Sequence, residues 1–212
     1  MNLFSTFDPS TGIMSINWIS MMMPTLMIPI KYWNNMNKIS LTMEKINMLM
    51  FNEIKSSMKT KGSSIMMLSL MMYIMLTNIN GLLPYSFTSS SHLSFSLALA
   101  LPMWLSSMIF GWMKKPKHML IHLIPSGTPT VLMPFMVMIE SISNLIRPGS
   151  LAVRLSANMI AGHLIMALLG SNSPYMMMMM MLLMMLMMFE LAVSMIQAYV
   201  FMTLINLYSS EI

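Results

Sequence analysis

Four ionisable side chains stand in one strongly apolar stretch, residues 139–170, and their chemistry needs an explanation. They are Glu140, Arg147, Arg154 and His163. On membrane-insertion scales a charge at the centre of a bilayer costs about 3 kcal/mol, so such residues are rare in spanning segments. A chain that keeps four of them is typical of proteins that move protons or ions.

Spacing predicts how these side chains are arranged on a helix. Glu140, Arg147 and Arg154 follow at intervals of seven residues, nearly two turns, so each lies about 20° from the last. Asn144 and Asn158 each come four residues after a charged position and extend the same polar edge. The remaining histidine comes nine residues after Arg154, about half a turn away, and faces elsewhere.

A shorter polar stripe lies near the C-terminus, where Glu190, Ser194 and Gln197 are spaced by four and three residues. A guanidinium stays protonated in proteins, so the arginines can act only as fixed cations. Carboxyl and imidazole groups can exchange protons, because their neutral forms are accessible in a low-dielectric site. Spread over two helices, these groups could serve two separate aqueous paths rather than one continuous wire.

Two explanations remain open for the arginines. Arg147 could pair with Glu140 and merely stabilise a helix bundle. Internal pairing explains Arg154 less well. The apolar helices hold two carboxylates, Glu140 and Glu190, which are too few to pair with both arginines and His163. We therefore expect Arg154 to meet a carboxylate of another subunit.

Composition predicts a membrane protein with one domain. The 212 residues are 57% hydrophobic and 8% charged, whereas soluble domains carry about 25% charged residues. The net charge of +5 comes mostly from lysines at 31–61 and 114–117, which report membrane topology rather than nucleic-acid binding. There are no cysteines, which excludes disulfides and thiolate metal sites.

The elements that must position the ionisable groups are helical. Residues 38–61 alternate apolar and polar positions at helical spacing, which predicts an amphipathic helix on the membrane surface or against a partner protein. Two later apolar runs are too long for upright spans and lack an internal polar turn. They predict a hairpin of strongly tilted helices, bent at Pro148-Gly149. The expected elements of the single domain 1–212 are a first span (15–33), the amphipathic surface helix (38–61), upright spans (62–83 and 92–113) and the long tilted helices (130–170 and 175–208).

Lysine distribution predicts the orientation. Both lysine clusters flank the same ends of the two upright spans, so the positive-inside rule places them on the cytoplasmic or matrix side. The N-terminus and the turn at 84–91 then lie outside. Five passes place the C-terminus inside.

Metal and haem sites receive little support. His118 and His122 have the spacing of two ligands on a helix, but zinc needs further ligands and none is nearby. We interpret them as interfacial histidines and expect no metal or cofactor. A haem carrier would need histidines on facing spans, and only His163 is deeply embedded.

Three runs of the sequence resemble subunit a of the F-type ATP synthase, above all the animal mitochondrial form. They are NINGLLPYSFTSSSHLSFSLALALPMW, GTPTVLMPFMVMIESISNLIRPGSLAVRLSANMIAGHLIMALLG and IQAYVFMTLINLYSSEI, and the opening FDPS is similar to arthropod versions. The resemblance covers essentially the whole chain, and AVRLSANMIAGH is its most specific part. Its departures are Ser156, where threonine is common, and methionine in place of leucine or isoleucine throughout.

The resemblance implies a stator subunit that feeds protons to a rotating ring of c subunits in the mitochondrial inner membrane. It implies as further partners a b-type peripheral-stalk subunit, small membrane stator subunits and the lipid bilayer, with no nucleic acid. The N-terminus would face the intermembrane space, and the lysine loops and C-terminus the matrix. Such a subunit performs no covalent chemistry and is not itself the ATP-forming catalyst. The other class that we weigh is a structural scaffold whose charges pair only internally.

The resemblance also assigns roles by motif. Arg154 in AVRL corresponds to the essential arginine that faces the ring carboxylate. Glu140 would line the half-channel open to the matrix, and His163 and Glu190 the half-channel open to the intermembrane space. Five further polar residues complete the candidate site: Asn144, Arg147, Asn158, Ser194 and Gln197.

Overall fold

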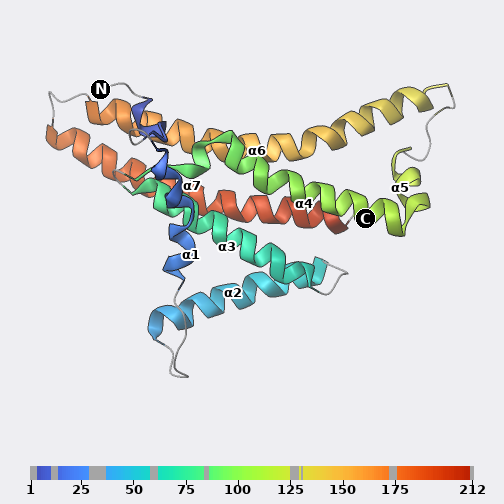
Figure 1. Ribbon diagram of the computed structural model, residues 1–212, viewed down its shortest axis with the longest axis horizontal. Helices are drawn as coiled ribbons and strands as arrows, with labels where there is room; N and C mark the ends of the chain where they lie inside the picture. The colour runs from blue at the N-terminus through green and yellow to red at the C-terminus, as the bar shows by residue number, and fades with distance from the viewer. Residues whose placement is uncertain are drawn as a thin grey trace.

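The structure, a computed structural model, is built from α-helices and short 3-10 helices (Figure 1). It describes residues 4–10, 14–28, 37–57, 62–83, 86–124, 129, 131–171 and 176–210. Within these ranges the chain forms no β-strand, and four helices are long and apolar enough to cross a membrane. The predicted class, an all-α integral membrane protein, is confirmed.

The N-terminal region differs from the single span expected at 15–33. Its described residues form two 3-10 helices, η1 (Ser5–Phe7) and η2 (Ile16–Met21), and the short helix α1 (Met23–Met27). No continuous helix runs through the described part because Pro24 lacks a backbone N–H and its ring would clash inside a helix. It stands instead in the first turn of α1, where proline is tolerated. The rest of the expected span lies outside the described residues.

The two expected upright spans correspond to α3 (Ser63–Leu82) and α4 (Leu93–Lys114). Their connection includes the 3-10 helix η3 (Ser89–Ser91), whose three serines are buried. The N-terminal 3-10 segment η2 contacts η3, so the start of the chain lies at the same end of the bundle as this turn. After α4, the short helix α5 (Pro116–His122) continues at the opposite, lysine-bearing end.

The two long apolar runs form α6 (Met133–Ser171) and α7 (Met176–Ser210), with 39 and 35 residues. At 1.5 Å per residue they are roughly 50–60 Å long, well beyond the ~30 Å of a hydrocarbon core. They lie side by side as the expected hairpin (Figure 1). Helix α6 is continuous through Pro148, and Figure 1 shows that the helix is curved.

The amphipathic helix expected at 38–61 is α2 (Lys38–Ser57). It lies under α3 at the edge of the bundle (Figure 1). Its C-terminal end packs against α3 and α7, where Ile54 is fully buried. Its other end stays open, and Ile39 is 73% exposed. One end of this helix therefore packs on the chain itself.

The core lies where α3, α4, α6 and α7 cross, with one contribution from α2. Helix α7 also turns a row of methionines outward, including Met185 and Met188 at 75% and 70% exposure. Such large apolar exposure is typical of a surface covered by lipid or by another protein. The buried apolar core comprises Ile54, Met67, Met71, Ile74, Ala100, Met103, Leu151, Ala152, Leu155, Ala198, Phe201, Met202 and Ile205.

Candidate functional site

Helix α6 has a buried face and an open face, and Arg154 lies on the open one. Leu151, Ala152 and Leu155 are almost completely buried against the bundle, because helical periodicity brings them to one side. Arg154 is exposed. Within the described part of the chain its guanidinium forms no hydrogen bond and no ion pair. A permanent cation is thus presented outward from an apolar helix.

One turn beyond Arg154, a hydrogen bond joins the two long helices. Asn158 Nδ2 donates to Gln197 Oε1 over 2.9 Å. Gln197 is itself buried, with 7% exposure. The sequence placed these residues on separate polar stripes, and the structure brings the two stripes together here.

Glu190 lies beside this hydrogen bond in a cavity of about 200 Å³ between α3, α6 and α7. Its side chain is buried, and neither carboxylate oxygen has a hydrogen-bond partner among the described residues. Buried polar groups without protein partners are met by water where the space allows it. Ser194, Asn158 and Gln197 also line this cavity, so it has both the room and the polar partners to hold water.

Gly162 determines how closely Glu190 approaches α6. A Cβ built at Gly162 would lie 2.8 Å from Glu190 Cδ and 2.8 Å from Oε1. Such distances are shorter than van der Waals contact, so any larger residue here would displace the carboxylate. The glycine thus allows the acidic group to lie directly against the backbone of α6.

His163 lies at the edge of the same region and is enclosed by the N-terminal segment. The Phe7 ring meets its imidazole edge-on, with centroids 6.2 Å apart. Its Nε2 is buried without a hydrogen-bond partner in the described chain. The Phe7 carbonyl lies 3.1 Å from His92 Nε2, and the His92 ring packs 5.1 Å from that of Trp18. The start of the chain therefore packs against His163, the residue that follows Gly162 of the cavity wall.

Asn78, on α3, is a member of this site that the sequence analysis did not single out. It is fully buried, lines the Glu190 cavity, and neither of its amide atoms has a partner among the described residues. The available signal was the pair Asn78 and Asn80 near the end of an apolar span. Only the packing of α3 against α7 shows which of the two asparagines faces the cavity.

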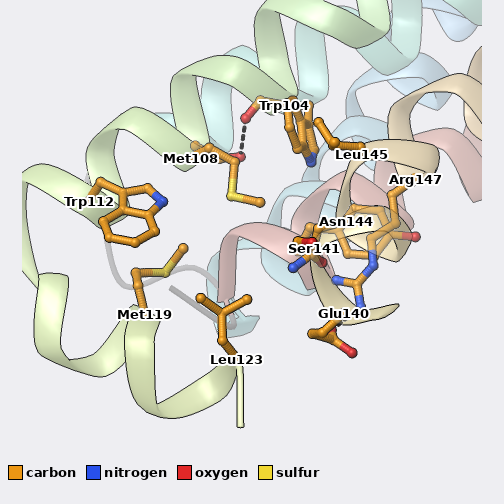
Figure 2. Close-up of a pocket in the computed structure, with 12 residues that line it drawn as sticks. Trp104, Met108, Trp112, Met119, Leu123, Glu140, Ser141, Asn144, Leu145 and Arg147 are labelled. Atoms are coloured by element: carbon orange, nitrogen blue, oxygen red, sulfur yellow. Dashed lines mark hydrogen bonds and ion pairs between the residues drawn. The ribbon is translucent and has the colours of Figure 1, made fainter. Parts of the chain in front are cut away.

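A second and larger cavity, about 430 Å³, surrounds Glu140 near the other end of α6 (Figure 2). Arg147 Nη2 lies 3.8 Å from Glu140 Oε1, so the expected pair is present. Asn144 lies between them along the helix and lines the same cavity. The opposite wall is apolar and comes mainly from α4 and α5, including Trp104 and Met119. Here the carboxylate is 39% exposed, in contrast to Glu190.

The predicted site residues thus divide into three groups along the α6–α7 hairpin. One surrounds Glu190, one surrounds Glu140, and Arg154 stands on the open face between them in sequence. His118, the first of the two histidines with metal-ligand spacing, lines neither cavity, and the side chain of His122 lies outside the described part of the chain. Among the described residues, no cluster of three or more His, Cys, Asp or Glu side chains could hold a metal ion.

Comparison with known proteins gives a consistent result over the full length. A family model described as ATP synthase A chain matches residues 12–210. Relatives named ATP synthase subunit a include those of Locusta migratoria, Anopheles gambiae and Aedes aegypti, which are 48%, 49% and 50% identical over 221, 222 and 222 residues. Each alignment covers 100% of this chain and 98% of the relative.

Proposed function

The chain belongs to the ATP synthase A chain family, and we propose that it carries protons past a rotating c-ring through two offset half-channels. Membership makes it a proton-translocating subunit of the membrane sector Fo and a part of that complex. The insect relatives and the apolar helices support a multi-pass protein of the mitochondrial inner membrane. What we propose beyond this is the division of labour among its residues.

The observation that carries the proposal is the exposed Arg154. An unpaired cation on the open face of an apolar helix is costly unless an anion from outside the chain meets it. A carboxylate on a c subunit is the partner that this arrangement fits. Because a guanidinium does not give up its proton, Arg154 would hold the ring carboxylate without carrying protons itself. The fixed charge would also stop protons from passing directly between the two half-channels.

The half-channel open to the intermembrane space is proposed to run through the Glu190 cavity. Glu190 and His163 are its proton-exchanging groups, and the hydrogen-bonded Asn158 and Gln197 line the cavity, with Asn158 one helical turn beyond Arg154. Supporting this, the cavity lies at the end of the bundle where η3 packs on α6 and Phe7 contacts His163. The positive-inside rule places that end away from the lysine clusters.

The half-channel open to the matrix is proposed to run through the cavity around Glu140. This cavity lies near the lysine-bearing end of α4. Its greater size and the partial exposure of Glu140 favour direct contact with water.

Proton flow then follows from the two sites. A proton arriving through the Glu190 side neutralises a ring carboxylate, which can face lipid at lower cost than the charged form. After nearly a full turn that carboxyl group reaches the Glu140 side, loses its proton and is held by Arg154. Each proton that crosses releases about 2.3 kcal/mol per 100 mV of membrane potential. The rotor delivers this energy elsewhere, and this chain forms no covalent bond.

The partners that we propose are the c-ring, a b-type peripheral-stalk subunit and small stator subunits. The outward row of methionines on α7 and the open face of α6 offer the apolar surface that a ring of helices needs. The exposed end of α2 offers a surface for the stator subunits.

The test is to replace Arg154 with Ala or Gln and to measure proton-driven ATP synthesis in assembled complexes. We expect synthesis to be lost while the complex still assembles. Lys114→Gln is the matched control, since Lys114 is a cation placed over the Phe110 ring rather than on the open face of α6. Full activity of the Arg154 variants would overturn the proposal and favour the scaffold function.

A further inference from the structure

Arg147 contacts the last turns of α7 as well as Glu140. Its guanidinium carbon lies 4.9 Å from the centre of the Tyr208 ring. Cations within about 6 Å of an aromatic centre are attracted to the ring face. Tyr208 also lines the cavity around Glu140. The C-terminal end of α7 thus reaches the cation of the matrix-side site.

The distance between Arg147 and Glu140 lies just beyond hydrogen-bonding range. Side-chain atoms 3.8 Å apart attract each other by charge but do not share a hydrogen bond. Within the described chain no residue donates a hydrogen bond to the Glu140 carboxylate. Glu140 stands at the edge of the cavity of about 430 Å³ (Figure 2), and its oxygens are left without a donor from the described chain.

Without a restraint, the two side chains would be expected to come closer. Arginine and carboxylate groups frequently form two parallel hydrogen bonds, which are stronger than a loose ion pair. Glu140 and Arg147 lie almost two turns apart on one edge of α6, and both side chains are long enough to meet. A bidentate pair would occupy the oxygens at which a proton has to arrive.

We propose that Tyr208 is a positioning residue, whose ring holds the Arg147 guanidinium near Glu140 but out of hydrogen-bonding contact with it. The cation then attracts the carboxylate without blocking it. The inference rests on the proposed function, in which Glu140 passes protons to the matrix. It assigns a task to Arg147, for which the sequence left open a structural pair with Glu140 or a supporting place in the candidate site.

The test compares Tyr208→Leu, which removes the aromatic face, with Tyr208→Phe, which keeps it. In assembled complexes at fixed proton-motive force, we expect Tyr208→Leu to lower ATP synthesis roughly threefold, in line with the strength of cation–π contacts. Tyr208→Phe should restore most of the rate. Equal losses in both variants, or no loss in Tyr208→Leu, would overturn the inference.

A second background separates positioning from simple packing. In Glu140→Gln complexes position 140 offers no carboxylate for Arg147 to capture, so adding Tyr208→Leu should have no further effect. If Tyr208 only packs the end of α7, the loss will be the same in both backgrounds, and the inference fails. Tyr199→Leu is the matched control, because Tyr199 also lies on α7 but donates to Glu53 at 3.4 Å, and its effect should be additive with Glu140→Gln.

The same set of variants shows which proposal has failed. If Glu140→Gln by itself leaves ATP synthesis unchanged, the assignment of the matrix half-channel is wrong, and the inference falls with it. If Glu140→Gln lowers the rate but Tyr208→Leu acts equally in both backgrounds, only the positioning role is wrong. Co-purification of the c-ring with each variant establishes that the complexes have assembled.

Discussion

The two embedded carboxylates of this chain lie in opposite kinds of environment. Glu190 is buried, packs against the backbone at Gly162, and has no hydrogen-bond partner among the described residues. Glu140 is 39% exposed and has Arg147 at 3.8 Å. The main influence on the Glu190 carboxylate is therefore its removal from water, whereas the Glu140 carboxylate keeps contact with water and has a charge nearby. Two half-channels that take up and release protons on opposite sides of a membrane would need this kind of difference.

The difference also concerns which parts of the fold build each site. The Glu190 cavity is formed by α3, α6 and α7, and Phe7 of the N-terminal segment packs on His163, next to Gly162 of its wall. The Glu140 cavity is formed by α4, α5, α6 and α7, and its wall is largely apolar. The position of the carboxylate is therefore tightly constrained at the Glu190 site and loosely constrained at the Glu140 site.

The largest effect is expected from exchanging the two carboxylates separately for amides. Glu190→Gln should lower proton-driven ATP synthesis by about a hundredfold, the typical cost of losing a positioned proton-transfer group. Glu140→Gln should cost only about tenfold, because the wider cavity lets water replace part of the path. ATP synthesis at fixed proton-motive force measures both. Equal losses would show that burial does not distinguish the two sites.

Gly162→Ala tests whether the position of Glu190 matters. The added methyl group would push the carboxylate away from α6, and displacing a reacting group by about 1 Å can cost up to 100-fold. We expect a loss of about tenfold, since the end of a glutamate side chain can partly adapt. Gly149→Ala on the same helix is the control, because a Cβ there meets nothing within 4 Å. A wild-type rate in Gly162→Ala would refute the tight constraint.

The hydrogen bond between Asn158 and Gln197 should have a smaller effect. Asn158→Leu and Gln197→Leu should each lower ATP synthesis about fivefold, matching the net value of one hydrogen bond. The double variant should be no worse than either one, because both remove the same interaction. Asn144→Leu, in the Glu140 cavity, is the control and should add to either loss. Fully additive losses at positions 158 and 197 would mean that the bond has no functional role.

The smallest effect concerns whether the N-terminal segment limits access to the Glu190 cavity. The chain has no cysteine, so a Leu82→Cys thiol in the cavity wall would be the only thiol in this subunit. Adding His92→Ala removes the contact between His92 and the Phe7 carbonyl. We expect a water-soluble maleimide then to label the thiol about threefold faster, which corresponds to the loss of one weak hydrogen bond. Ser10→Ala, which alters only a local contact with Asp8, should not change it. An unchanged rate in His92→Ala would mean that the segment does not close the cavity.

The sequence predicted most of the helical elements because their signals are local. Long apolar runs, helical spacing of polar residues and lysine clusters are read from neighbouring positions, and α3, α4, α6 and α7 lie within a few residues of the expected ranges. The first span was predicted less well. Its apolar composition suggested one helix, but in the described part the 3-10 helix η2 gives way to α1 at Met23, with Pro24 in the first turn of α1.

The candidate site was predicted in its members but not in its grouping. Residue types and spacing selected Arg154, Glu140, His163 and Glu190, because ionisable groups stand out in an apolar chain. Asn78 was missed, since a neutral amide in a span carries a weaker signal. The roles of all these residues remain predictions until the variants are measured.

By itself, the sequence determined that this protein is a helical membrane protein with a fixed cation and a few proton-exchanging groups on two long helices. Hydrophobicity and periodicity are properties of single segments, so they can be read without knowing how the segments meet. Only the tertiary structure decided that Glu190 packs on Gly162, that Phe7 covers His163, and that Tyr208 reaches Arg147. These contacts join residues distant in the chain, and they depend on how the helices cross.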